Sequence, residues 1–193
     1  MSKKSAVAAV FLDRDGVINE EVGHISDPRH LRYIPHVARA IRKLNERAIP
    51  VVVVSNQSGV ARGYHTDEQV EIIHEAISAE LKKEGAHIDR FYFCPHHPTE
   101  GKGAYLVECD CRKPRPGLLL QAAKELHLDL PRCVMIGDKK SDIEAGHAVG
   151  TRTILVLTGD GTTTHASWRE SFKPTHVAHD LHEAVEWFLS DAD

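Results

Sequence analysis

Two aspartates, separated by one residue, follow a short apolar run near the start of the chain. The run ends at Leu12, and Asp13, Arg14, Asp15 and Gly16 come next. A carboxylate such as that of Asp13 can attack phosphorus and give an acyl phosphate that water hydrolyses. Asp15 is placed to protonate the leaving oxygen and then to deprotonate the water, and Gly16 lets the backbone approach a phosphate. The pair suggests phosphate-ester hydrolysis, with a plain acidic turn as the alternative.

Three further polar elements favour the chemical interpretation. Ser55 follows an apolar run and offers a hydroxyl to a phosphoryl oxygen, with the next backbone amides as further donors. Lys113 brings a positive charge that can screen a nucleophile and a phosphate from one another. Asp138 follows another apolar run and can join Asp13 in holding Mg²⁺ through hard oxygen ligands. Each residue alone fits an ordinary surface loop, but together they predict a magnesium-dependent phosphatase site.

A second group of residues has the composition of a metal site. Cys94 is followed by His96 and His97, and Cys109 lies two residues before Cys111. Four soft or borderline ligands are the number that a closed tetrahedral zinc site needs. Such a site would order the long loop that contains them, whereas free thiols fit its polar surroundings badly. Spacing does not choose between the two histidines.

Alternating apolar runs and helical patterns must position these side chains. Runs typical of buried parallel strands cover residues 6–12, 51–54, 88–93, 133–136 and 153–157. Helical patterns cover 35–48, 66–84, 116–126 and 182–189, and capping-box sequences begin at Thr66 and Ser141. This alternation predicts an α/β fold with a doubly wound, mainly parallel sheet. Ligands of such sheets bind beyond the carboxyl ends of the strands, where the polar residues fall.

Length and composition set the remaining limits. The 193 residues are 41% hydrophobic and 27% charged, which fits one domain over residues 1–193. A net charge of −4 gives no support for a nucleic-acid or membrane surface, which needs clustered basic residues. The N-terminal apolar run stops at Asp13 without a signal-peptide cleavage site, and no run approaches the ~20 residues of a membrane span. We expect a cytoplasmic monomer whose thiols bind metal or are buried.

The phosphatase motifs resemble those of the haloacid dehalogenase (HAD) superfamily of phosphohydrolases, over residues 10–161. The resemblance implies Asp13 as nucleophile, Asp15 as general acid and base, and Ser55 and Lys113 as phosphate-stabilising residues. It leaves open whether Asp142 touches the metal. It implies that Mg²⁺ is held by the Asp13 carboxylate, the Asp15 backbone carbonyl and Asp138.

The loop that contains the predicted zinc ligands, residues 94–111 and here called the zinc loop, makes the family resemblance more specific. Segments 55–63, 93–98 and 109–114 are similar to those of the D-glycero-D-manno-heptose 1,7-bisphosphate phosphatases, which lack a large cap domain. The resemblance implies a sugar bisphosphate hydrolysed at C7, with Arg112 and Lys139 binding phosphate. Zinc would be held by Cys94, His96, Cys109 and Cys111. The substrate-binding positions would be Glu21, Val22, Gly23, His24, Ser55, Asn56, Gln57, Ser58, Arg112, Lys113 and Lys139.

Three other classes of protein share parts of this pattern. Histidinol-phosphate phosphatases have the catalytic motifs and a shorter zinc loop, but residues 60–63 and the long stretch 98–108 fit the heptose type better. A phospho-receiver module carries its phosphorylated aspartate after the third strand, where this chain has Cys94. A zinc-organised nucleic-acid binder needs a basic or aromatic face, whereas the zinc loop contains Glu100, Glu108 and Asp110.

Overall fold

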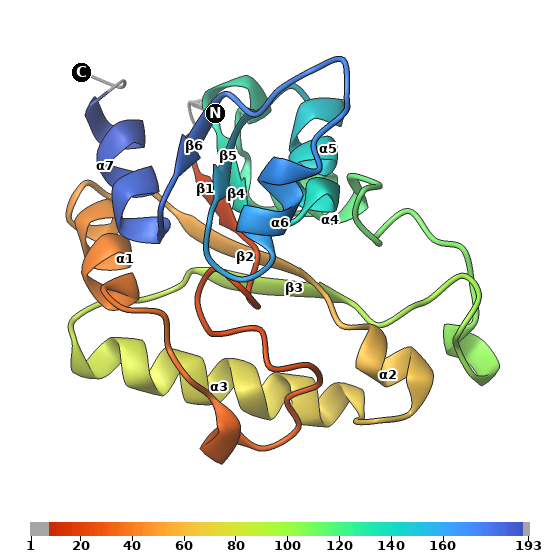
Figure 1. Ribbon diagram of the computed structural model, residues 1–193. Coiled ribbons are helices and arrows are strands. Elements are labelled where there is room, and N and C mark those ends of the chain that lie inside the picture. The colour runs from red at the N-terminus through yellow and green to blue at the C-terminus, as the bar shows by residue number, and fades with distance from the viewer. Residues whose placement is uncertain (1–7, 191–193) are drawn as a thin grey trace, which may run out of the picture.

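A six-stranded parallel sheet with helices on both faces forms the centre of the computed structural model, which describes residues 8–190 (Figure 1). The strands are β1 (Val10–Leu12), β2 (Val51–Asn56), β3 (Arg90–Cys94), β4 (Val134–Gly137), β5 (Arg152–Val156) and β6 (His176–Ala178). The helices are α1 (Val37–Glu46), α2 (Ser58–Arg62), α3 (Asp67–Lys83), α4 (Gly117–Leu126), α5 (Lys140–Ala148), α6 (Gly161–Ala166) and α7 (Leu181–Ser190).

Burial on both faces explains why the strands are continuous apolar runs. In β1, Val10 and Leu12 belong to the cluster that also contains buried residues of α1, α3 and α7. Phe11 points to the opposite face and packs with residues of α4 and α5, because successive side chains of a strand alternate between faces. Each face of the sheet therefore has its own apolar core, and the sheet is held rigidly between them.

The strand order creates a crevice beside β1. The order is β3-β2-β1-β4-β5-β6, so β1 has β2 on one side and β4 on the other. The chain leaves β1 for β2 and returns to β4 only after β3, and the connections diverge at this point. In a parallel sheet such a switch point opens a crevice at the carboxyl ends of the strands. We therefore expect a ligand-binding site at the carboxyl ends of β1, β2 and β4.

The predicted elements are confirmed to within a few residues, with three omissions. Strand β6 and helices α2 and α6 were not predicted. β6 has three residues at the edge of the sheet, too few to show a periodic pattern. The predicted first strand began at residue 6, and its first two residues lie outside the described range.

Of the two predicted capping boxes, one is confirmed and one is wrong. The Thr66 hydroxyl accepts from the backbone N–H of Gln69, whose side chain accepts in return. The other helix does not start at Ser141. It begins at Lys140, and the Asp142 carboxylate accepts the backbone N–H of Lys139 at 3.0 Å. The buried Asp142 side chain thus caps α5 earlier than the sequence pattern suggested.

The long connection after β3 is anchored beside the site. Residues 95–116 contain a single 3₁₀ turn, Gly103–Tyr105, and the backbone N–H of Lys102 donates to the Ala61 carbonyl of α2 at 2.9 Å.

Within residues 8–190 no helix has the length and apolar character needed to cross a membrane.

Candidate active site and metal sites

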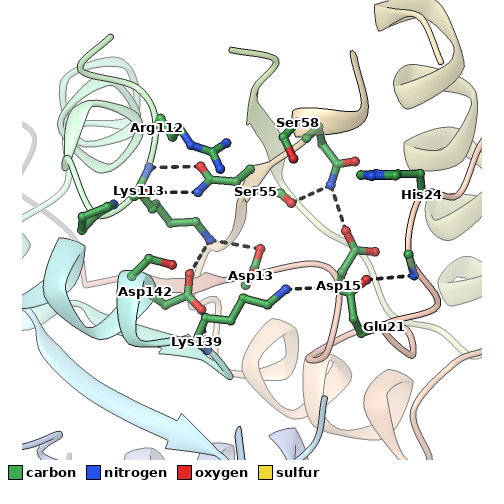
Figure 2. A pocket seen from close by; sticks show the side chains of 15 residues that line it. Asp13, Asp15, Glu21, His24, Ser55, Ser58, Arg112, Lys113, Lys139 and Asp142 are labelled. Carbon is green, nitrogen blue, oxygen red and sulfur yellow. Dashed lines mark hydrogen bonds and ion pairs between the residues drawn. The ribbon is translucent and has the colours of Figure 1, made fainter. Parts of the chain in front are cut away.

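A cavity of about 390 Å³ opens at the carboxyl ends of β1, β2 and β4 (Figure 2). Its walls contain acidic, basic, hydroxyl and amide side chains. Most of the predicted active-site residues line it, whereas Val22 and Asp138 are not among the lining residues. The lining consists of Asp13, Asp15, Glu21, Gly23, His24, Ser55, Asn56, Gln57, Ser58, Arg112, Lys113, Pro114, Lys139, Ser141 and Asp142. Sequence positions that are up to 129 residues apart (13 to 142) therefore meet in one cavity, as the strand-end rule predicts.

The ammonium of Lys113 lies between two carboxylates at the bottom of this cavity. Its Nζ is 3.0 Å from Asp13 Oδ1 and 2.6 Å from Asp142 Oδ1, and it donates to the Val54 carbonyl at 2.7 Å. Figure 2 shows the side chain reaching from the backbone next to Arg112 toward Asp13. Burial alone would lower the pKa of Lys113, but the charges of Asp13 and Asp142 outweigh it and raise that pKa. Lys113 is therefore a fixed cation next to the Asp13 carboxylate.

Three carboxylates form a cluster suited to a hard cation. Oxygens of Asp13, Asp138 and Asp142 lie within 4.8 Å of one another. Asp138 is fully buried; its Oδ2 accepts the backbone N–H of Asp160 at 2.8 Å, while its Oδ1 has no hydrogen-bond partner among the described residues. Burial and the charges of Asp13 and Asp142 raise the pKa of Asp138 to about 8. An unpartnered buried oxygen within an all-carboxylate donor set fits Mg²⁺ well.

Two glycines allow the backbone to close around Asp138. Gly16 has φ +84°, and a Cβ on it would lie 2.2 Å from Asp138 Oδ2. A Cβ on Gly159 would lie 2.3 Å from the same oxygen. Thr158 ties the two segments together, because its hydroxyl donates to the Gly16 carbonyl at 2.6 Å. The turn after β5 therefore belongs to this site, although its sequence showed no chemical signal.

Asp15 is held by a buried polar network rather than by Lys113. Arg14 donates to both of its carboxylate oxygens, with Nη2 at 3.0 Å from Oδ1 and 2.8 Å from Oδ2. The side-chain amide groups of Asn19 and Gln57 donate to Asp15 at 2.8 and 2.9 Å. Burial raises the pKa of Asp15, but the Arg14 charge and these hydrogen bonds outweigh it, and the pKa lies below its ordinary value. Asp15 and Asp13 are thus in different electrostatic environments.

Polar groups at the mouth of the cavity are paired with one another. Lys139 Nζ lies 2.6 Å from Glu21 Oε2 and 3.7 Å from Asp160 Oδ2. Arg112 donates through Nη1 to the backbone carbonyl of His96 at 3.1 Å. Val22, between Glu21 and Gly23, is 52% exposed, so the 21–24 loop presents its side chains at the surface beside the entrance. These cations can face an anionic ligand that enters from solvent.

The predicted cysteine and histidine ligands come together in the loop after β3. Cys111 Sγ lies 3.0 Å from Cys94 Sγ, 3.2 Å from Cys109 Sγ and 3.4 Å from His96 Nδ1. A tetrahedral zinc site with Zn–S bonds of about 2.3 Å has edges of about 3.8 Å. The four donors lie slightly closer together than this, and their type and number are those of a zinc site. The hydrogen bond between the Cys94 and Cys111 sulfurs lowers the pKa of Cys111 to about 5. His97 lies apart, its Nδ1 accepting backbone N–H groups of residues 99 and 100.

Several residues of the site were not recognised in the sequence. Arg14, Asn19, Thr158 and Gly159 all touch a predicted active-site residue. Arg14 and Asn19 flank the acidic pair, and a buried charge between two aspartates was the signal that could have identified Arg14. The contacts of Thr158 and Gly159 depend on the packing of β5 beside β4, for which the local sequence has no marker.

Comparisons with known proteins agree with this geometry. The HAD-hydrolase-like family model matches residues 110–184. The chain is 42% identical over 183 residues to the D-glycero-β-D-manno-heptose-1,7-bisphosphate 7-phosphatase of Escherichia coli (strain K12), covering 94% of this chain and 95% of that protein. It is 42% identical over 156 residues to the protein of the same name from Haemophilus influenzae, covering 80% and 84%.

A solved structure has the same fold over almost the full length. It is the D,D-heptose 1,7-bisphosphate phosphatase of B. bronchiseptica, in complex with magnesium and phosphate. The TM-score is 0.86 at 32% identity, and the match covers 96% of this chain and 99% of that one.

The carboxylate cluster predicts a pH-dependent stability that a divalent cation removes. The pKa of Asp138 rises from 3.8 to about 8 on folding, so the folded protein binds more protons than the unfolded protein between these values. The contribution of Asp138 to the free energy of unfolding in EDTA therefore falls as pH rises from about 4 to about 8, whereas His74, whose pKa burial lowers to about 3, contributes in the opposite sense below about pH 6.5. Compared with the wild type, Asp138→Asn therefore loses less stability, or gains more, over this pH range, and Mg²⁺ stabilises it less at pH 8. Chemical unfolding of the wild type and of Asp138→Asn at several pH values checks this prediction. The same pH dependence of the free energy of unfolding in both proteins would contradict it.

Proposed function

Because the chain belongs to the D-glycero-D-manno-heptose 1,7-bisphosphate phosphatases of the HAD superfamily, we propose that it removes the C7 phosphate of D-glycero-β-D-manno-heptose 1,7-bisphosphate. The products are heptose 1-phosphate and inorganic phosphate. The observation that carries this proposal is the 42% identity, over 94% of the chain, to a phosphatase of that name. The sequence alone left the anomer open, and the names of the relatives support the β form.

In this proposal Asp13 is the nucleophile. Its carboxylate oxygen bonds to the C7 phosphorus while the bond between phosphorus and the C7 oxygen breaks, which gives a phospho-aspartate. Lys113, 3.0 Å from Asp13 Oδ1, reduces the repulsion between the carboxylate and the incoming phosphate. The Ser55 hydroxyl and the backbone amides after it stabilise the phosphoryl oxygens. Water then attacks phosphorus and releases phosphate and the free Asp13 carboxylate.

Asp15 moves the proton in both half-reactions. It donates a proton to the C7 oxygen as that oxygen leaves, and it takes one from the attacking water afterwards. Arg14, Asn19 and Gln57 hold its carboxylate in place. The same hydrogen bonds favour the ionised form, which is the form needed in the second half-reaction.

The proposed metal is Mg²⁺, and Asp13, the Asp15 backbone carbonyl and Asp138 would hold it. When bound, Mg²⁺ supplies positive charge that neutralises the carboxylates and the phosphoryl oxygens. Asp142 has a different task, because its two oxygens are engaged by Lys113 and by the backbone N–H of Lys139. It fixes the lysine and caps α5.

Recognition of the rest of the substrate falls to the cations and loops at the entrance. Arg112 and Lys139 offer charge to phosphate oxygens, and a guanidinium can bind two of them at once. Lys139 is paired with Glu21, so a phosphate that reaches Lys139 competes with this carboxylate. The 21–24 loop, including His24, and Ser58 are placed to contact the sugar hydroxyls.

We also propose that Cys94, His96, Cys109 and Cys111 hold a structural zinc ion. Their four donors would order the loop that carries Arg112, whose guanidinium is fixed on the His96 carbonyl. Thiol ligands persist in a reducing compartment, which supports a cytoplasmic location.

Phosphate release from a panel of substrates tests the proposed activity. The panel contains the β and α anomers of the heptose 1,7-bisphosphate, fructose 1,6-bisphosphate and histidinol phosphate. We expect the highest kcat/KM for the β-heptose bisphosphate, with heptose 1-phosphate as the product. A preference for histidinol phosphate would overturn the substrate and leave the chemistry intact.

Asp13→Asn tests the nucleophile. The amide has nearly the same shape but cannot form the acyl phosphate, so kcat should fall by at least ~10³-fold. Thermal unfolding should show a folded protein, since the amide side chain still fits beside Lys113. A variant with more than about one tenth of the wild-type rate would show that another group attacks phosphorus.

Metal analysis tests the zinc site. Protein purified without chelator should contain about one zinc per chain, and Cys109→Ser should remove it and lower the thermal midpoint. Cys133→Ser is the matched control for zinc content, because Cys133 is buried in the core and lies outside the cluster. The proposal would be contradicted if the wild-type protein contained no zinc and the Cys109→Ser variant had the same thermal midpoint as the wild type.

A further inference from the structure

We propose that Asn56 and Gln57, at the carboxyl end of β2, are positioning residues that act through Lys113 and Asp15 respectively. The inference rests on the proposed function, because it takes Asp15 as the proton donor and Lys113 as the cation beside the nucleophile. It differs from a role in substrate contact: the polar ends of both amide side chains are already bonded to these two residues and to their neighbours.

Gln57 links the proton donor to the phosphate-binding hydroxyl. It is 5% exposed, and its Nε2 donates to Asp15 Oδ2 and to Ser55 Oγ, both at 2.9 Å. Its Oε1 accepts from Arg14 Nη2 at 3.0 Å. The reverse orientation of the amide would place its oxygen against the Asp15 carboxylate and its NH₂ against the guanidinium. The charges on either side therefore fix which end of the amide faces Asp15.

This orientation also sets the direction of the Ser55 hydroxyl. Ser55 Oγ accepts a hydrogen bond from Gln57, so one of its lone pairs is occupied. Its own O–H remains free to donate toward the cavity that Ser55 lines. Gln57 thus prepares Ser55 as a donor to a phosphoryl oxygen while it holds Asp15 for proton transfer.

Asn56 holds the backbone of Lys113 at two points. Its Nδ2 donates to the Lys113 carbonyl at 2.9 Å, and its Oδ1 accepts the Lys113 backbone N–H at 3.0 Å. These bonds join β2 to the end of the long loop that delivers the lysine. Because the Lys113 side chain must reach Asp13, Asp142 and the Val54 carbonyl together, a small shift of its backbone would break that arrangement.

Alternation along an extended chain explains how adjacent residues serve different partners. Side chains two apart lie on the same face, and neighbours lie on opposite faces. Gln57 therefore lies with Ser55 near Asp15, while Asn56 points the other way toward Lys113. The last residue of β2 and the residue after it thus place Lys113 and Asp15 relative to the same strand.

The leaving group distinguishes a positioned acid from a general loss of structure. A sugar alkoxide needs a proton as it departs, whereas a nitrophenolate leaves without one. For Gln57→Met we expect kcat/KM for the heptose bisphosphate to fall ~30-fold or more and kcat/KM for nitrophenyl phosphate to fall several times less. Gln57→Glu, which keeps the shape but cannot donate to Asp15 when ionised, should show the same contrast. Equal losses on both substrates, or no loss, would overturn the role of Gln57.

Asn45 supplies a matched control for Asn56. Its amide makes the same two bonds to the backbone of His87, at 3.1 and 2.9 Å, and both asparagines are partly buried. Asn56→Ala should lower kcat/KM for both substrates ~10-fold or more and weaken inhibition by inorganic phosphate. Asn45→Ala should cost similar thermal stability and leave both properties unchanged. An Asn56→Ala enzyme no slower than Asn45→Ala would overturn the role of Asn56.

Failure of the proposed substrate is a separate outcome. If the wild-type enzyme does not hydrolyse the heptose bisphosphate but cleaves another alkyl phosphate of the panel, the proposed substrate is refuted and the positioning roles are not. The better alkyl phosphate then replaces it in the comparison with nitrophenyl phosphate, and the contrast expected for Gln57→Met is the same.

Discussion

The buried ammonium of Lys113 is the interaction on which the rest of the site depends. Asp13 and Asp142 are both buried, and burying a carboxylate is costly unless an opposite charge or donor meets it. Lys113 meets both at once and uses its third hydrogen for the Val54 carbonyl. Because Asp142 also caps α5, one cation ties together β1, β2, the long loop and the helix after β4. Removing it would leave the buried charges of Asp13 and Asp142 without a cation.

The carboxylates of the site differ in how many donors and cations they contact, and this difference explains the roles proposed for them. Asp15 has a guanidinium and two amide donors of its own, whereas Asp138 has a single backbone donor and one oxygen without a partner among the described residues. The pKa values move accordingly, downward for Asp15 and to about 8 for Asp138. A divalent cation beside Asp138 would offset both the burial and the repulsion from Asp13 and Asp142 that raise its pKa. Protein groups therefore stabilise Asp15, the proposed proton-transfer carboxylate, while Asp138 is left for a cation.

The sequence was informative where function depends on residue type and strand position, and less so where it depends on packing. The acidic pair, Ser55, Lys113 and Asp138 could be predicted to converge because parallel strands bring their carboxyl ends to one edge. The cysteines of the loop were recognisable by their chemistry. By contrast, Thr158 and Gly159 reach the site only because β5 lies beside β4. The choice of His96 over His97 likewise depends on which ring faces the thiols.

The placement of positioning groups on the sheet and recognition groups on loops separates two requirements. Asn56 is the last residue of β2 and Gln57 follows it, and this strand is buried on both faces and bonded to β1 and β3. Their geometry is therefore as rigid as the core. The 21–24 loop and Arg112 lie outside the sheet, and Arg112 depends on the Cys/His cluster for its position through the His96 carbonyl. Changes in the 21–24 loop can alter which sugar phosphate enters without moving Asp13, Asp15 or Lys113, because the contacts that hold those three side chains come from other segments. These contacts are made by Arg14, Asn19, Val54, Gln57 and Asp142.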